Sequence, residues 1–195
     1  MSDENASLAS DRKSAQNVLV SGTVGAGKTT AIKTLSDSFI IDNNFGEQVF
    51  DCGELKITDT ESVFLYAFNG LNNSEFIWNY LNNEVIGTIL LIDNRRKDPL
   101  RDLESLLLNL YSGDQSQILP EQFVIGITHF DTSRTPAVSD YHSFLKDLSF
   151  ISQQKTPIFS VDTRAFHDVS TLMEALVYTR APTINVSLSE EKEYQ

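Results

Sequence analysis

Short apolar runs alternate along the chain with amphipathic segments, a pattern typical of strands joined by crossover helices in a mostly parallel sheet. Turn residues at 58–61 separate two of these runs, which indicates an antiparallel hairpin early in the sheet. A later run, 88–93, has four uninterrupted aliphatic residues, so we expect a strand that is buried on both faces. Strands are predicted at residues 17–21, 49–57, 62–68, 88–93, 122–128 and 157–160. The predicted fold class is therefore α/β.

Helical periodicity fills the intervals between the predicted strands. Asp98-Pro99 is a typical helix start, and the leucines that follow share one face. Asp168 is expected to cap the last helix, whose inner face carries Val169, Leu172, Met173, Leu176 and Val177. The other helices are predicted at residues 28–36, 75–81 and 140–150.

The composition fits one compact domain, to which we assign residues 17–180, since 195 residues with 41% hydrophobic content leave room for a single core. The polar segments 1–16 and 181–195 are predicted to be disordered tails. A net charge of −12 disfavours nucleic acid and anionic lipid as partners. Neither a signal peptide nor a membrane-inserting segment is expected. Because Cys52 is the single cysteine, no internal disulfide is possible, and the cytoplasm is the expected compartment.

Residues 22–29 read Gly-Thr-Val-Gly-Ala-Gly-Lys-Thr, which matches the phosphate-binding P-loop pattern G-x-x-x-x-G-K-T. Glycines at this spacing let backbone N–H groups converge on an anion, while the lysine and the following helix N-terminus add positive charge. A predicted strand precedes the motif, as such a loop requires; the alternative is a glycine-rich turn before a helix. The Thr29 hydroxyl is expected to face Mg²⁺. The expected phosphate-binding residues are Gly22, Gly25, Ala26, Gly27, Lys28, Thr29 and Thr30.

A second candidate segment, Thr128-His129-Phe130-Asp131, follows a predicted strand late in the chain. Ligands of open α/β sheets bind beyond the carboxyl ends of strands, where Asp131 would accept the two N–H groups of a guanine edge that adenine lacks. The His129 ring is expected to lie against the base, and Val161 and Asp162 are expected to add backbone donors. The alternative is an ordinary strand-to-loop transition with Asp131 as a turn residue.

Together these motifs resemble those of Ras-like small GTPases, in particular the bacterial small GTP-binding proteins related to gliding-motility GTPases. The likeness extends from residue 17 to about residue 179 and rests on the Gly-Ala-Gly-Lys-Thr-Thr loop, on Leu91-Ile92-Asp93-Asn94 before Asp98-Pro99, and on Thr128-His129-x-Asp131. It implies a three-layer P-loop NTPase fold with about six strands and helices on both faces. It also implies GTP or GDP and Mg²⁺ as cofactors, Gly70 as a phosphate contact, and a roadblock-type regulatory protein as partner.

The departures from that family concern catalysis. Its members carry, after the third strand, an acid that orients Mg²⁺ and a glutamine that positions water, but here Ala67 and Leu71 stand in those places. Leucine neither donates to water nor accepts from it, so the catalytic residues are unknown. Segment 39–57 has no serine or threonine to sense a γ-phosphate, and a connection of about ten residues is expected between the first helix and the second strand. The sequence predicts weak intrinsic hydrolysis, as in a pseudoGTPase.

Several other residues have more than one interpretation. Asp93 is either a substitute magnesium ligand or the end of a buried strand. The histidines His129, His142 and His167 lack metal-ligand spacing, so no zinc site is expected. The aromatic segment 76–80 either packs entirely into the core or leaves an exposed anchor for a partner.

Three functional hypotheses follow. The first is a degenerate small GTP-binding protein that holds GDP or GTP and acts by docking to another protein. The second is a working GTPase with substitute catalytic groups, Asp93 among them. The third is a P-loop nucleotide or small-molecule kinase, which the scattered arginines disfavour because such enzymes need an arginine-bearing lid.

Overall fold

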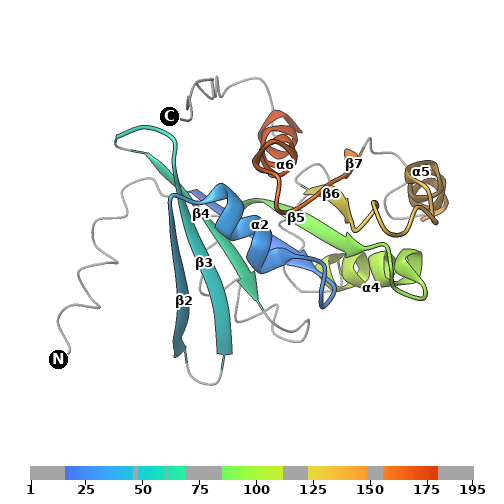
Figure 1. Ribbon diagram of the computed structural model, residues 1–195, viewed down its shortest axis with the longest axis horizontal. Coiled ribbons are helices and arrows are strands. Elements are labelled where there is room, and N and C mark those ends of the chain that lie inside the picture. The colour runs from blue at the N-terminus through green and yellow to red at the C-terminus, as the bar shows by residue number, and fades with distance from the viewer. Residues whose placement is uncertain are drawn as a thin grey trace.

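A computed structural model describes residues 16–45, 48–59, 61–68, 85–111, 123–148 and 156–179. Within them the chain forms one mixed sheet of seven strands in the order β2-β3-β4-β1-β5-β6-β7 (Figure 1). The strands are β1 (Gln16–Gly22), β2 (Ser38–Phe45), β3 (Gln48–Lys56), β4 (Ser62–Phe68), β5 (Val85–Asp93), β6 (Phe123–Thr128) and β7 (Ile158–Ser160). The helices are α2 (Lys28–Leu35), α4 (Pro99–Tyr111), α5 (Val138–Asp147) and α6 (Phe166–Thr179). The predicted α/β class, with a mostly parallel sheet, is confirmed.

The sheet has one strand more than the prediction, and that strand lies at its antiparallel edge. The predicted hairpin of β3 and β4 is present, with Phe50 opposite Phe68 and Lys56 opposite Ser62. β2 pairs antiparallel with the outer side of β3, and only two residues lie between it and the end of α2. The expected ten-residue connection is therefore wrong, because most of that segment is extended and paired at the edge of the sheet.

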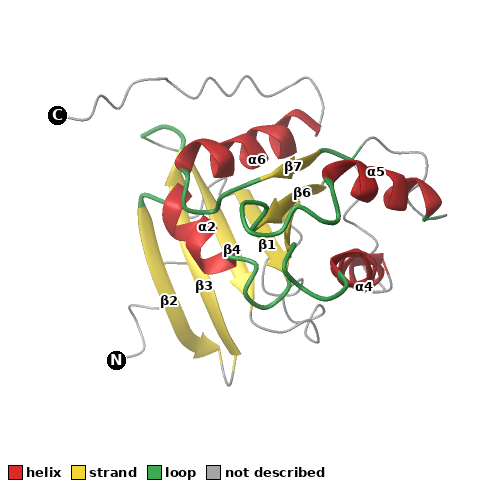
Figure 2. Ribbon diagram, turned by 45° about the vertical axis from the view of Figure 1, so that its right-hand side comes forward, coloured by secondary structure: helices red, strands yellow, loops and turns green. Residues whose placement is uncertain are grey.

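Helices cover both faces of the sheet, and neighbouring residues of β5 show the division. Ile89 and Leu91 belong to a core shared with α2 and α6, whereas Leu90 and Ile92 belong to a core shared with α4 and α5. Successive strand residues point to opposite faces, so a strand buried on both sides needs the unbroken aliphatic run seen in the sequence. α2 and α6 lie side by side in both ribbon views (Figure 1, Figure 2).

The helix starts agree with the sequence in one case and differ in another. Asp98 caps α4 as predicted, since its carboxylate accepts the Arg101 N–H at 3.2 Å. Asp168 does not cap the last helix, because α6 begins at Phe166 and Asp168 lies in its first turn. The Asp168 carboxylate instead accepts the Asp162 N–H at 2.8 Å, which ties α6 to the loop after β7.

Some predictions lie outside the described residues, namely the helix at 75–81 with its aromatic segment and the two tails. In the part of the chain that the structure describes, no helix is both long and apolar enough to cross a membrane.

Candidate nucleotide-binding site

The predicted phosphate loop connects β1 to α2 at the centre of the sheet. The backbone conformation of the loop requires glycine at three positions, Gly22, Gly25 and Gly27. A Cβ on Gly22 would lie 2.2 Å from the Leu91 carbonyl oxygen of β5, and Gly25 and Gly27 have φ angles of 83° and 89°. L-residues with a side chain avoid this left-handed region, so the loop curls as it does because glycine stands at these positions.

Lys28, the first residue of α2, folds back over the loop. Its Nζ donates to the carbonyl oxygens of Gly22 at 3.0 Å and Thr23 at 3.1 Å. Burial lowers the pKa of the Lys28 ammonium, and the negative charge of Asp51 partly offsets that effect. The ammonium group is thus held against the curled backbone of the loop. There it would add positive charge beside the loop N–H groups for an anion bound at the loop.

Asp51 is a site residue that the sequence analysis missed. It lies in the middle of β3 with only 6% of its surface exposed, and its carboxylate accepts the hydroxyl hydrogen of Thr29. The Thr29 hydroxyl was expected to face Mg²⁺, and its proton is directed to the acid. No motif marks Asp51, because its nearness to Thr29 depends on the pairing of β3 with β4, which the local sequence does not encode.

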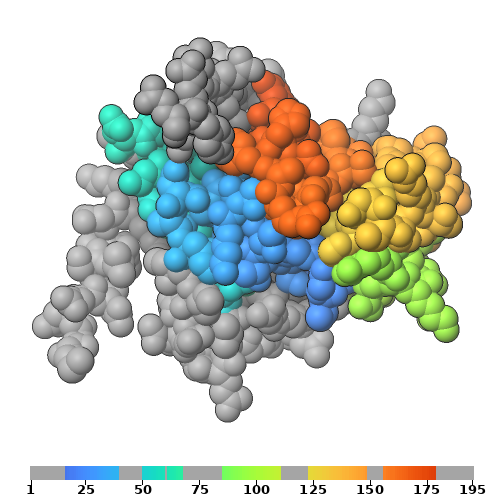
Figure 3. Space-filling model, viewed as in Figure 1, coloured from blue at the N-terminus to red at the C-terminus, as the bar shows by residue number. Residues whose placement is uncertain are grey.

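A cavity of about 670 Å³ extends from the phosphate loop to the segment after β6. Its lining includes Gly25, Gly27 and Thr30 at one end, Thr128, His129 and Asp131 at the other, and Val161, Asp162 and Thr163 along the side. In the space-filling view the blue phosphate-loop region, the yellow loop after β6 and the orange start of α6 meet on one face (Figure 3). The structure therefore brings together the two candidate segments, which lie about a hundred residues apart in the chain.

His129 links these two ends of the cavity. Its backbone is left-handed, with φ 57°, and its Nε2 lies 3.1 Å from the Gly25 carbonyl oxygen, where the Nε2–H tautomer donates. Thr128 anchors the strand end before it, since its hydroxyl donates to the Ile92 carbonyl at 3.2 Å. The His129 ring thus links the loop after β6 to the phosphate loop.

Comparison with solved structures finds many domains of the same architecture. The G domain of the FeoB iron transporter from T. maritima superposes with a TM-score of 0.61 at 16% identity, covering 86% of this chain and all of that one. The Arl6 BBS3 small GTPase from Trypanosoma brucei, solved with the nucleotide analogue GppNp, gives 0.64 at 14% identity over 86% of this chain and 98% of its own. The chain has a P-loop GTPase fold. The elongation factor SelB from Methanococcus maripaludis contains the same fold within a third of its length, with a TM-score of 0.59. Neither protein-family models nor curated proteins match the sequence.

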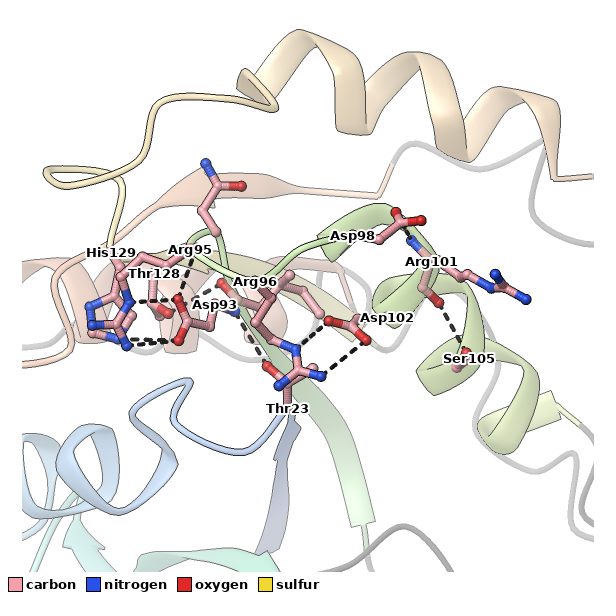
Figure 4. A network of polar contacts seen from close by, with 12 residues as sticks. Thr23, Asp93, Arg95, Arg96, Asp98, Arg101, Asp102, Ser105, Thr128 and His129 are labelled. Atoms are coloured by element: carbon pink, nitrogen blue, oxygen red, sulfur yellow. Dashed lines mark hydrogen bonds and ion pairs between the residues drawn. The ribbon is translucent and has the colours of Figure 1, made fainter.

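Within this P-loop GTPase fold, Asp93 at the end of β5 is engaged by an arginine (Figure 4). Arg95 donates to both carboxylate oxygens of Asp93, at 3.0 and 2.8 Å, and the Arg95 backbone N–H donates as well. Burial opposes ionisation of Asp93, but these bonds and the charges of Arg95 and His129 outweigh it and lower the pKa. The ion pair agrees with the strand-end interpretation of Asp93. A role of Asp93 as a magnesium ligand stays a prediction. The acid that the Thr29 hydroxyl contacts is Asp51 and not Asp93.

Asn94, the residue after Asp93, positions the loop that carries Asp131. Its side-chain amide donates to the carbonyl oxygens of Ser133 at 2.7 Å and Pro136 at 3.1 Å. Its Oδ1 accepts the Tyr141 hydroxyl of α5 at 2.7 Å. Burial raises the pKa of Tyr141, and the charges of Asp102 and Asp93 add to the shift, so its phenol stays a donor.

The backbone donors expected after the last strand are largely taken. The Val161 N–H donates to the Ile127 carbonyl at 2.9 Å, and the Asp162 N–H donates to Asp168. Both residues line the cavity, but the next residue, Thr163, is the better candidate, because no bond of its own N–H is found among the described residues. The Asp162 side chain is bound by Arg164, whose hydrogen bonds lower the pKa of that carboxyl to about 2.

The remaining candidates are placed as follows. Ala26 is buried in the loop, with its N–H donating to the Thr23 carbonyl at 3.2 Å, and Thr30 lines the cavity. Ala67 is buried near the end of β4, directly opposite Asp51. Gly70 and Leu71 lie outside the described residues.

Proposed function

We propose that this chain binds GDP or GTP together with Mg²⁺ and acts as a small GTP-binding regulatory module with little hydrolytic activity of its own. The observation that carries the proposal is a cavity of about 670 Å³ that is lined both by Gly25, Gly27 and Thr30 of the phosphate loop and by Asp131. Such a cavity at the carboxyl edge of a mostly parallel sheet is where this class of fold binds its ligands. The bound analogue of the T. brucei Arl6 structure supports a nucleotide as the ligand.

The charges around Asp131 support guanine as the base. Asp131 is an exposed carboxylate on the cavity wall, and Arg95 and Arg164 of the same lining are engaged with Asp93 and Asp162. Asp131 is therefore left to accept the N1–H and the 2-amino group of guanine, two donors that adenine does not present together.

The chemistry of the donor set also suits Mg²⁺. The described residues contain no cluster of three His, Cys, Asp or Glu side chains that could hold a metal by themselves. Mg²⁺ in nucleotide sites relies on few protein oxygens together with phosphate oxygens and water, and the Thr29 hydroxyl would be one of these protein ligands. Mg²⁺ would supply charge neutralisation at the phosphates.

Weak hydrolysis follows from two features of the sheet. Ala67 carries no group that could orient Mg²⁺ or water. The resembled family takes its γ-phosphate sensor from the segment after its first helix. Here that segment, which follows α2, is the edge strand β2, and three strands (β3, β4 and β1) lie between it and β5. A regulatory protein partner that supplies the missing groups, of the roadblock type implied by the resemblance, remains part of the proposal.

The direct test is titration of fluorescent GDP, GTP and ATP analogues into purified protein with Mg²⁺. Lys28→Ala should abolish binding, whereas Lys33→Ala, which removes an exposed lysine of the same helix, should leave it unchanged. Asp131→Asn should exchange guanine preference for xanthine preference, because the amide donates where the carboxylate accepted. Equal or tighter ATP binding would remove the role of Asp131, and Lys28→Ala at full affinity would exclude the phosphate loop.

Hydrolysis is tested separately by phosphate release under single-turnover conditions. The proposal expects no faster release with the chain than with its Lys28→Ala variant. Rapid unassisted turnover would instead support the hypothesis of a working GTPase with substitute catalytic groups.

A further inference from the structure

Asp51 is a buried acid with no place in the site predicted from the sequence. It is 6% exposed and lies at the centre of an antiparallel ladder, where an ionised carboxylate is costly unless hydrogen bonds or a cation compensate it. Its partners are the Thr29 hydroxyl, which donates to it, and the ammonium group of Lys28, on which its charge acts. Both partners belong to the phosphate loop and neither belongs to the β3–β4 hairpin itself.

The register of the β3–β4 hairpin places Asp51 beside the position where the resembled family carries an acid. Asp51 on β3 is directly opposite Ala67 on β4. Opposed residues of an antiparallel pair point to the same face, with Cβ atoms roughly 4.5–5.5 Å apart. Ala67 is the position at which the resembled family carries its magnesium-orienting acid, so the acid here stands on the neighbouring strand.

Asp51 and Ala67 lie on the face of the sheet that α2 covers, which is the face where Thr29 lies. Ala67 belongs to the core formed with α2 and α6. Gly53, two residues after Asp51 on the same side of β3, lies so close to α2 that a Cβ there would come 2.6 Å from Ile32 Cγ2. This close approach brings the start of α2, with Thr29, within reach of the Asp51 carboxylate.

We propose that Asp51 takes over, from β3, the magnesium-positioning role that Ala67 cannot fill on β4; this inference rests on the proposed nucleotide function. A hydroxyl that binds a cation through its oxygen must point its hydrogen elsewhere. Here the Thr29 hydroxyl donates a hydrogen bond to the Asp51 carboxylate. The oxygen lone pairs of Thr29 are then left for Mg²⁺, and the carboxylate adds negative charge behind it. Asp51 is a positioning residue that acts through Thr29.

The experiment measures release of a fluorescent GDP analogue as Mg²⁺ is titrated from an EDTA-containing solution. Wild type should release nucleotide more slowly as Mg²⁺ rises, with a defined midpoint. Asp51→Asn removes the negative charge and leaves Thr29 a weaker acceptor, and it should move that midpoint about 10- to 100-fold higher, the usual effect of disturbing a partner that orients a metal ligand. Without Mg²⁺ its release should be no faster than that of wild type, because a carboxylate beside phosphates is repulsive. Glu54→Gln, a charge loss on the same strand but the opposite face, should match wild type.

A double variant distinguishes a magnesium role from a structural one. Asp51→Ala combined with Ala67→Asp moves the acid across the strand pair and should bring the midpoint from the value of Asp51→Asn back toward that of wild type. Folding of each variant is checked without nucleotide by circular dichroism. If Asp51→Asn does not fold, Asp51→Ala removes both the acceptor for Thr29 and the charge, and it carries the same expectation.

Three results separate the failure of this inference from the failure of the function. A folded Asp51→Asn protein with the wild-type midpoint overturns the inference and leaves nucleotide binding intact. A double variant that stays at the midpoint of Asp51→Asn overturns the equivalence of the two positions. Wild-type protein that binds no guanine nucleotide overturns the proposed function, and the inference falls with it.

Discussion

Gly27, the last glycine of the phosphate loop, is a position at which a single added methyl group should destabilise the fold. Its φ is +89°, and an added Cβ would lie 2.6 Å from Oγ1 and 3.1 Å from Cγ2 of Thr163. Thr163 cannot move away easily, since it is 8% exposed and its carbonyl accepts the Thr34 hydroxyl at 2.8 Å. Gly25 is the matched control, because its φ is +83° but its Cβ would meet only Asp93 Oδ2, at 3.5 Å.

The magnitude follows from these two costs. Left-handed backbone strains alanine by about 1–2 kcal/mol, and forcing a methyl group into a packed region costs a further 1–3 kcal/mol or so. Gly27→Ala should therefore lower the free energy of unfolding by about 2–5 kcal/mol, as the sum of both. Gly25→Ala should lower it by only about 1–2 kcal/mol, from strain alone.

Urea unfolding of the nucleotide-free protein measures both values. The Thr163→Ala background separates the overlap from the strain, because it removes both close atoms and leaves the Thr163 Cβ at 3.3 Å. In that background Gly27→Ala should cost about the same as Gly25→Ala. Equal losses for the two single variants, or an unchanged loss for Gly27→Ala in the Thr163→Ala background, would refute the overlap.

Two further predictions concern the loops that follow β6 and β7. Tyr141→Phe leaves the buried Oδ1 of Asn94 without its 2.7 Å donor and should cost about 1–3 kcal/mol of stability, measured by thermal or urea unfolding; an unchanged midpoint would mean that the bond contributes nothing. Arg164 lowers the Asp162 pKa from 3.8 to about 2, so the stabilising effect is complete above pH 4 and is lost as the pH falls toward 2. Asp162→Asn should flatten the fall of the unfolding midpoint across that interval, and an unaltered profile would contradict the assignment.

The features that the sequence predicted are those encoded locally. The phosphate loop needs glycines, a lysine and a threonine at fixed spacing between a strand and a helix, and all of these are adjacent in the chain. The aliphatic run of β5 and the Asp98 cap of α4 are local in the same sense. His129 and Asp131 were found because loops that follow strands in such sheets meet at one edge.

The features that the sequence did not predict depend on contacts between distant segments. β2 was expected to be mainly a loop, and its residues 38–45 form a strand because β3 offers them an unpaired edge. Asp168 has the composition of a cap, yet its carboxylate bonds the Asp162 N–H from a different loop. Asp51 acquires its place only through strand register, since a slip of one residue would turn its side chain to the other face.

Register also explains how an acid can change strands while the chemistry stays in place. In an antiparallel pair two residues far apart in sequence present their side chains to the same few ångströms of space, so either can serve a ligand that lies over that face. A motif search requires the acid on β4 and finds Ala67, whereas the Thr29 hydroxyl donates to the carboxylate at the opposed position on β3. The two departures from the resembled family, at Ala67 and in the γ-phosphate sensor, therefore differ in their expected effect. The missing acid has a structural substitute, but the missing γ-phosphate sensor has none within the described residues, because β2 is held at the far edge of the sheet. Under the two proposals above, we expect the chain to retain a cation at its nucleotide without a γ-phosphate sensor in the segments that the structure describes.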